Sequence, residues 1–135
     1  KCSDFAIFAS KKKEIEKINI LNASLLAMKR SILKLKFKPK IVKVDGNKKP
    51  NINKLNIKSV VRGDQKIPEI SAASILAKVS RDRLIKKMSK KFKAYLWDKN
   101  VGYGTRDHLS AIKKFGITKH HRKTFKPIHN ILSPK

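Results

Sequence analysis

Apolar residues recur at two different spacings along this chain, and the two spacings predict helices and strands respectively. A spacing of three and four residues runs through 19–35, with charged side chains on the opposite side. A second helix is predicted from Pro68 to about residue 92, because proline suits a first helical turn. A third is predicted over 105–115, with Thr105 as its N-cap and Gly116 as its stop.

Three short runs rich in apolar or β-branched residues predict strands over 5–9, 41–45 and 57–61. A short charged helix is predicted over 11–17, a turn at Gly63-Asp64 and a loop over 93–105. From Ile117 onward the sequence predicts an irregular basic tail with a short helix near its end. Because strands alternate with helices, the pattern predicts one α/β domain over residues 1–135 with a basic C-terminal segment.

The composition gives the chain a strong positive charge. The 135 residues include 35 Lys and Arg against 9 Asp and Glu, a formal net charge of +26, which favours a polyanionic partner such as nucleic acid. Lys, Ile and Asn can all be encoded by A and T alone, so a base-skewed genome is an alternative source of the lysine surplus. In either case the positive field attracts polyanions.

The same composition excludes several classes of protein. Cys2 is the single cysteine, so neither an intramolecular disulfide nor a cysteine metal cluster can form. No apolar run approaches the length of a membrane span, and no signal-peptide pattern is present. We therefore expect a cytoplasmic monomer without a membrane partner. The chain begins with Lys1 rather than Met, which suggests a fragment or a trimmed form.

Two acids are the main candidates for chemistry. Ser71, Ser74, Lys78 and Asp82 follow one another at steps of three, four and four, which places them on one face of the predicted helix. Asp45 ends a predicted strand, and such ends commonly carry ligand groups in α/β proteins. Asp45 and Asp82 could converge on one metal ion.

Each acid also has a simpler interpretation. Asp45 could bond only the backbone of its own turn. Asp82 could be a solvated acid that pairs with a neighbouring arginine or with Lys78 or Lys86 at helical spacing, an interaction of little energetic value. The pattern of residues leaves both interpretations open.

Aromatic and histidine residues near the end of the chain suggest further contacts. Tyr103 lies between two glycines and could stack on a sugar or a base, or hold its own loop in place. The run His120-His121-Arg122-Lys123 could suggest metal or phosphate binding, but adjacent side chains point in different directions. We therefore expect this run to form a basic surface.

Several segments, taken in order, carry a resemblance to a known family. They are residues 19–28, Val44-Asp45-Gly46-Asn47, residues 63–64 with 67–79, Arg81-Asp82, Gly102-Tyr103-Gly104-Thr105 with His108, and residues 120–125. Together they resemble bacterial ribonuclease HII over nearly the whole chain. The long motif over 67–79 is the most specific part of the resemblance.

The resemblance implies a ribonuclease-H-like α/β domain with a mixed central sheet flanked by helices. It also implies an endonuclease that cleaves RNA in RNA–DNA hybrids and single ribonucleotides in duplex DNA, with Mn²⁺ or Mg²⁺ as cofactor. By resemblance, Asp45 and Asp82 are catalytic metal-binding acids and Tyr103 stacks on the sugar at the cleavage junction. Ser74 and Lys78 would lie near the site as substrate-binding residues.

The chain departs from the family pattern at its beginning. Members of the family open with a strand carrying Gly-x-Asp-Glu-x-Gly-Arg-Gly, which supplies two further acids, and no segment here matches it. We therefore expect the opening strands to be missing and the activity of this chain alone to be impaired. The alternatives are a non-catalytic basic protein that binds nucleic acid and a Lys-rich ribosome-associated protein.

Overall fold

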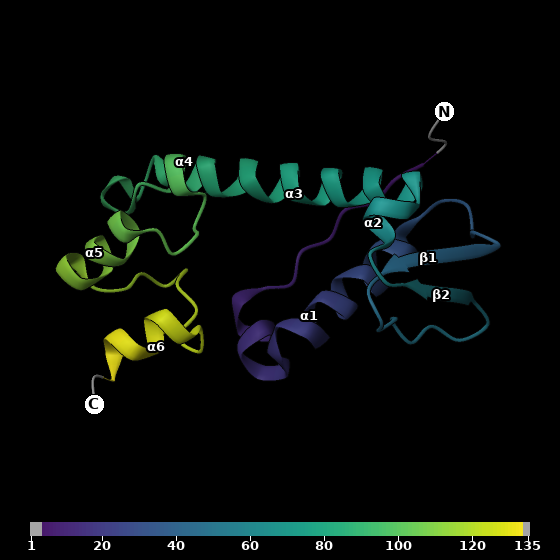
Figure 1. Cartoon of the computed structure of the whole chain (residues 1–135), viewed down its shortest axis with the longest axis horizontal. Coiled ribbons are helices and arrows are strands. Elements are labelled where there is room, and N and C mark those ends of the chain that lie inside the picture. Colours follow the sequence, from purple (N-terminus) through teal and green to yellow (C-terminus); the bar gives the residue numbers. More distant parts are fainter. Residues whose placement is uncertain (1–3, 134–135) are drawn as a thin grey trace. The chain divides into compact units, whose positions relative to one another are not determined.

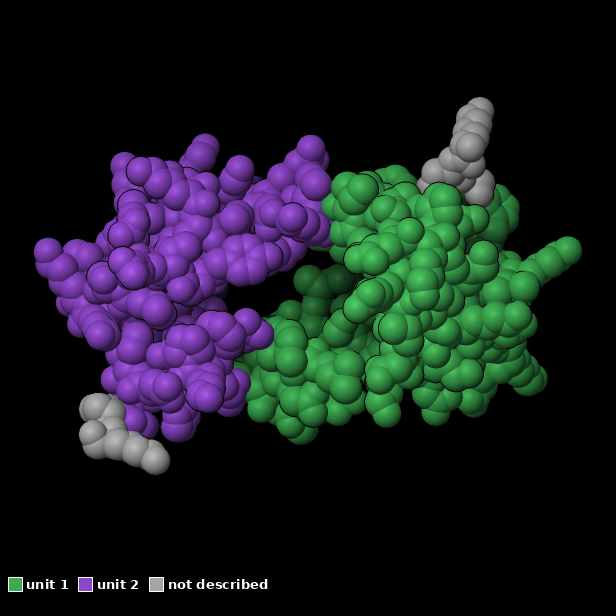
Figure 2. All heavy atoms as spheres, in the orientation of Figure 1, with its two compact units in different colours: residues 1–77 green, residues 78–135 purple. Residues whose placement is uncertain are grey.

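The computed structural model describes residues 4–133, so that Cys2 lies outside the described part. The chain divides into two compact units, Lys1–Ala77 and Lys78–Lys135, which are coloured separately in Figure 2. The boundary falls within helix α3 (Pro68–Ser89), which therefore contributes residues to both units. The single domain expected over 1–135 stays a prediction.

The first unit begins with helix α1 (Lys12–Lys34), which is interrupted at Asn19. Asn19 has a φ of 64° and a ψ of 170°, a backbone conformation that is far from helical and rare for a residue with a side chain. Its side-chain oxygen accepts a hydrogen bond from the Asn22 amide at 3.0 Å, as an N-cap does. The interruption separates the two helical segments that the sequence predicts over 11–17 and 19–35.

Two parallel strands form the sheet of the first unit (Figure 1). Strand β1 (Ile41–Asp45) pairs with β2 (Asn56–Val60), in a register that places Asp45 opposite Val60. Parallel strands end at the same edge of a sheet, so the helix α2 (Gly63–Lys66) that follows β2 begins beside the end of β1. Both strands confirm the predicted positions within one residue, whereas the mixed sheet stays a prediction.

The strand predicted over 5–9 is wrong. These residues have no regular secondary structure, and the Phe8 amide donates a hydrogen bond to the Ser31 hydroxyl at 3.1 Å rather than to a neighbouring strand. Phe5 is exposed. A short apolar run forms a strand only where a partner strand supplies backbone hydrogen bonds, and here the adjacent element is a helix.

The second unit is entirely helical apart from its loops. After α3 come a 3₁₀ turn η1 (Lys93–Tyr95) and the helices α4 (Trp97–Asn100), α5 (Arg106–Phe115) and α6 (Lys126–Leu132). Thr105 caps α5 and Gly116 ends it, as predicted. Helix α3 ends at Ser89, three residues before the predicted end at 92. None of the helices within 4–133 is long and apolar enough to cross a membrane.

Two aromatic residues from the segment predicted as a loop belong to the core of the second unit. Its buried members are Tyr95, Trp97, Ala111, Ile112 and Ile128. Tyr95 and Trp97 lie in η1 and α4, and their rings stack with centroids 5.6 Å apart. Single helical turns show no apolar periodicity, which is why the sequence pattern did not reveal them.

An ion pair joins the two segments of α1 and makes the stability of the protein depend on pH. Glu14 accepts hydrogen bonds from both terminal nitrogens of Arg30, at 2.6 and 3.1 Å, and from the Lys11 amide at 2.7 Å. The hydrogen bonds from Arg30 and then from the Lys11 backbone lower the pKa of Glu14 from 4.5 to about 2. The carboxylate therefore stabilises the folded state above the unfolded pKa, and this stabilisation is lost as the pH falls towards 2.

We expect Glu14→Gln to remove this acid-sensitive contribution. Urea unfolding midpoints measured from about pH 6 to about pH 2 should fall less steeply for the variant than for the unchanged chain. Glu16→Gln is the matched control, because Glu16 pairs with Lys12 at the longer distance of 3.7 Å and belongs to the same helix. Parallel pH curves for Glu14→Gln and the unchanged chain would contradict the expectation.

Candidate active site

Asp45 lies at the carboxyl end of β1, where its side chain reaches the neighbouring turn. Its Oδ1 accepts a hydrogen bond from the Gly63 amide at 2.7 Å. Gly46, with a φ of 93°, then turns the chain, and its amide donates to the Val60 carbonyl at 2.9 Å. The carboxylate is thus held through one oxygen by the backbone that follows β2, and not by the backbone of its own turn. This hydrogen bond engages one of the two carboxylate oxygens.

Gly63 allows this close approach because it has no side chain. A Cβ atom at this position would lie 2.7 Å from Cδ1 of Ile70, 3.3 Å from Cβ of Val60 and 3.6 Å from Cα of Asp45. The first distance is far below an ordinary contact, and Ile70 is buried, so its side chain has little room to move. The predicted turn at Gly63-Asp64 is the start of α2, and it fixes the Asp45 carboxylate.

Asp82 lies on α3 in the second unit, with 23% of its side chain exposed. A terminal nitrogen of Arg81 lies 3.0 Å from Oδ1 of Asp82. Asp82 therefore forms an ion pair with a neighbouring arginine, which is one of the interpretations that the sequence left open. An ion pair this exposed contributes little stability, about 0–1 kcal/mol. Its main effect is on geometry, because it holds one oxygen of Asp82.

Arg81 also brings Tyr103 into the same group. The Arg81 guanidinium lies 4.9 Å from the centroid of the Tyr103 ring, a cation–π contact. Gly102, with a φ of 79°, precedes the tyrosine, and a Cβ atom there would lie 3.7 Å from a terminal nitrogen of Arg81. We call Arg81, Asp82 and Tyr103 the Asp82 cluster. Tyr103 is 57% exposed as a residue, so it remains accessible to a stacking partner.

Ser74 and Lys78 are exposed on α3. Because α3 is one continuous helix from Pro68 to Ser89, steps of four residues place both on the face that carries Asp82. Ser74 belongs to the first unit and Lys78 to the second. Their substrate-binding roles stay predictions.

The donors that the described residues offer are suited to a hard cation but are few. Asp45 and Asp82 present carboxylate oxygens, the ligands that Mg²⁺ and Mn²⁺ prefer. Within residues 4–133, no group of three or more His, Cys, Asp or Glu side chains lies together in a way that could hold a metal ion. The metal site at Asp45 and Asp82 therefore stays a prediction.

The basic surface predicted for residues 120–123 is wrong for His121, which is only 5% exposed. Its ring contacts the rings of Trp97 and His108 in the interior of the second unit. His108 is also buried, and its Nδ1 lies 2.8 Å from the Tyr103 carbonyl oxygen. Sequence reasoning missed these supports of the Tyr103 segment. The one available signal is the appearance of His108 and His121 in the segments that carry the resemblance.

The fold of the chain defines it as an α/β protein of the ribonuclease H type. The crystal structure of the ribonuclease H2 from Pyrococcus horikoshii OT3 matches the fold of this chain with a TM-score of 0.70. The match covers 90% of this chain and 64% of the chain from Pyrococcus horikoshii. Sequence identity in that match is 23%, so the match establishes the fold alone.

Sequence comparison then gives the family. The family model for ribonuclease HII matches residues 2–128. A ribonuclease HII from Pelagibacter ubique (strain HTCC1062) is 64% identical over 132 residues, which are 98% of this chain and 71% of the relative. One from Christiangramia forsetii is 51% identical over 114 residues, 84% of this chain and 58% of the relative. The chain belongs to the ribonuclease HII family, and it spans between about half and three quarters of the length of these relatives.

Proposed function

We propose that the protein is an endoribonuclease that hydrolyses the RNA strand of RNA–DNA hybrids and single ribonucleotides embedded in duplex DNA. The products would carry 5′-phosphate and 3′-hydroxyl ends. The observation that carries this proposal is family membership over residues 2–128, a range that includes Asp45, Asp82 and Tyr103.

In this proposal Asp45 and Asp82 hold Mn²⁺ or Mg²⁺ through carboxylate oxygens. Such an ion, when bound, would stabilise the negative charge of the phosphate and activate water for attack. The contribution of this chain is to orient the ligands: the Gly63 amide holds one oxygen of Asp45, and Arg81 holds one oxygen of Asp82. Each carboxylate is therefore partly ordered before a metal binds.

The exposed ring of Tyr103 is the proposed contact with the sugar at the cleavage junction. Stacking needs an accessible aromatic face and a fixed ring, and Arg81 holds this ring by its cation–π contact. Lys78 is the proposed contact with a backbone phosphate, and Ser74 is a further substrate-binding residue on the same helix. The proposed substrate contacts thus come from residues that precede Asp82 in the sequence and from one that follows it.

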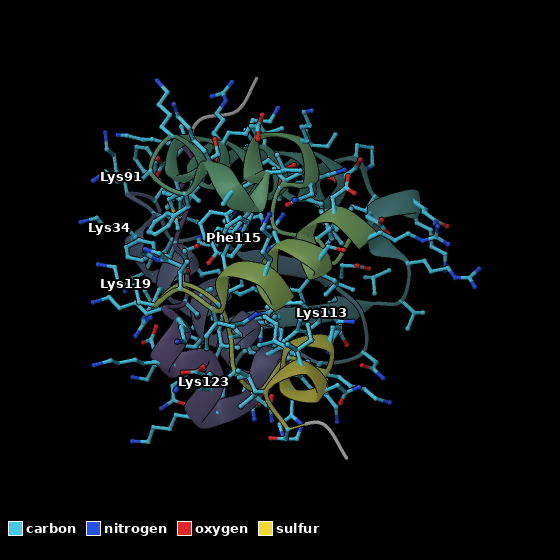
Figure 3. The ribbon with its side chains drawn as sticks, turned by 90° about the vertical axis from the view of Figure 1, so that its left-hand side faces the viewer. Lys34, Lys91, Lys113, Phe115, Lys119 and Lys123 are labelled. Atoms are coloured by element: carbon cyan, nitrogen blue, oxygen red, sulfur yellow. The ribbon has the colours of Figure 1, made fainter. Side chains whose placement is uncertain are left out.

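Positive charge on the second unit supports a nucleic-acid substrate. Acids occur in residues 78–135 only at Asp82, Asp98 and Asp107, whereas lysines and arginines are spread throughout. Figure 3 shows Lys91 and Lys119 extending away from the ribbon on the same side of the view. Such a surface binds phosphates without reading sequence, which suits an enzyme that must recognise any hybrid.

We expect the 135-residue polypeptide by itself to bind divalent metal weakly and to cleave slowly. Two carboxylates offset only part of the charge of the cations, and Mg²⁺ demands near-octahedral coordination. The absence of a group of three or more potential ligands within residues 4–133 supports this expectation.

The test uses three labelled duplexes of the same sequence: an RNA–DNA hybrid, a DNA duplex with one ribonucleotide, and an all-DNA duplex. With protein in excess, we expect slow cleavage of the first two when Mn²⁺ or Mg²⁺ is present and none with a chelator. Binding to all three should fall by about 10³-fold or more between about 50 and 200 mM salt if six or more phosphates are contacted.

The outcomes separate the proposal from its alternatives. Salt-sensitive binding with no metal-dependent cleavage, even after prolonged incubation, would indicate a non-catalytic nucleic-acid-binding protein and overturn the proposal. Equal cleavage of the all-DNA duplex would indicate a nuclease of a different specificity. Preferential binding to ribosomal particles without hybrid cleavage would support the ribosome-associated alternative.

A further inference from the structure

Two buried histidines connect the core of the second unit to the backbone of Tyr103. His108, on α5, is 4% exposed, and His121, in the loop before α6, is 5% exposed. The Nε2 atoms of the two rings lie 3.2 Å apart, and Nδ1 of His108 lies 2.8 Å from the Tyr103 carbonyl oxygen. The pair therefore forms a continuous path from the interior to the segment that carries the exposed tyrosine.

The groups at the two ends of this path determine which nitrogens carry protons. The Thr118 backbone amide can only donate, and it lies 2.9 Å from Nδ1 of His121, so this nitrogen is an acceptor. The Trp97 indole can only donate, and it lies 3.0 Å from Nε2 of His108, so that nitrogen is also an acceptor. At the other end, the Tyr103 carbonyl can only accept.

One arrangement with a single proton on each ring is consistent with these donors and acceptors, and in it Nε2 of His108 is shared between the Trp97 indole and His121. His121 carries its proton on Nε2 and donates it to Nε2 of His108. His108 carries its proton on Nδ1 and donates it to the Tyr103 carbonyl, which also accepts the Thr105 amide at 2.9 Å. Buried polar groups cost free energy unless they are bonded, so this pattern favours a single position of the Tyr103 backbone.

We infer that His108 is a positioning residue: its Nδ1–H holds the Tyr103 segment in place, and Trp97 and His121 impose the tautomer that makes this bond. The inference deepens the proposed function, in which Tyr103 contacts the sugar, and it rests on that function for its biological purpose. The tautomer and the bond can be tested without any substrate.

The first test reads the tautomers by nitrogen NMR of the full 135-residue chain. We expect His108 to carry its proton on Nδ1 and His121 on Nε2 at neutral pH. His120 and His129 are exposed and provide reference signals within the same sample. A proton on Nε2 of His108, or on Nδ1 of His121, would overturn the inference.

The second test separates the two ends of His108 with two variants. In His108→Asn the amide nitrogen can take the place of Nδ1 and keep the bond to Tyr103. In His108→Gln the longer side chain reaches the place of Nε2 and keeps the contacts to Trp97 and His121 instead. We expect hydrogen exchange of the Thr105 amide, which shares the Tyr103 carbonyl, to speed up about tenfold in His108→Gln and little in His108→Asn.

The amide of Ile112, in the buried core, is the internal control for general destabilisation. If exchange at Ile112 and Thr105 rises equally in both variants, His108 is only a core residue and the inference is wrong. Hydrogen exchange at Thr105 could change as expected while neither variant alters the preference for a ribonucleotide-containing duplex over an all-DNA duplex. In that case His108 does hold the Tyr103 segment, but the proposed contact of Tyr103 with the sugar is wrong. Loss of that preference in His108→Gln, retained in His108→Asn, would support both.

Discussion

Replacing Asp45 with asparagine is expected to reduce metal-dependent cleavage of a ribonucleotide-containing duplex by about 10²–10³-fold, because a metal ligand supplies several kcal/mol and each 1.36 kcal/mol is a factor of ten in rate. In the unchanged chain the Gly63 amide donates to Asp45 at 2.7 Å. The amide oxygen of asparagine can accept the same hydrogen bond, so the fold should be unchanged. The measurement is a single-turnover time course with protein in excess. Electron paramagnetic resonance of free Mn²⁺ gives metal affinity independently of cleavage.

Asp64→Asn is the matched control for Asp45→Asn. Asp64 lies on α2, is exposed and carries the same charge, but we assign it no part in the site. We expect this variant to keep its cleavage rate and its Mn²⁺ affinity. Equal losses in the two variants would mean that net charge, and not a ligand at Asp45, determines the effect. Unchanged cleavage by Asp45→Asn would remove Asp45 from the proposed site.

Shortening Ile112 to alanine is expected to lower the free energy of unfolding of the second unit by about 2–5 kcal/mol. Ile112 is 2% exposed and packs in the cluster that contains Tyr95 and Trp97, so the truncation removes buried apolar surface and leaves a cavity. Trp97 is the single tryptophan of the chain, so its fluorescence reports urea unfolding of this cluster directly.

Leu84→Ala is the comparison for Ile112→Ala within the same unit. Leu84 lies on α3 and is 53% exposed, so its removal should change the free energy of unfolding by no more than about 0.5 kcal/mol. Ile112→Val should lower the free energy of unfolding by an intermediate amount, about 0.5–1.5 kcal/mol. A midpoint for Ile112→Ala equal to that of the unchanged chain would show that the Tyr95–Trp97 cluster does not stabilise this unit.

The long elements could be predicted because they carry their own signals. Three of the five residues of strand β1 are β-branched and apolar, and α5 has an N-cap at Thr105 and a glycine stop, all readable without a partner. The strand over 5–9 was wrongly predicted for the opposite reason. A strand is stabilised by its neighbour, and the neighbour of Phe8 is a helix residue, Ser31.

The sequence could name candidate site residues but not the groups that hold them. Asp45 and Asp82 stood out because acids are rare in a chain of net charge +26. Their partners did not stand out: the Gly63 amide comes from a different element, and the contact of Arg81 with Tyr103 depends on the turn at Gly102. Contacts between residues distant in sequence depend on packing, which no local pattern records.

By itself, the sequence determined the class of fold and a charge that favours nucleic acid, and it singled out Asp45, Asp82 and Tyr103 as candidates, because periodicity, residue type and net charge are properties of the chain alone. Only the tertiary structure decided that His121 is buried rather than part of a basic surface, and that Trp97, His108 and Tyr103 are linked. The physical reason is that a histidine is polar enough for water and also suited to a buried hydrogen-bond network. Its place is set by the donors and acceptors that folding brings within 3 Å or so of its ring.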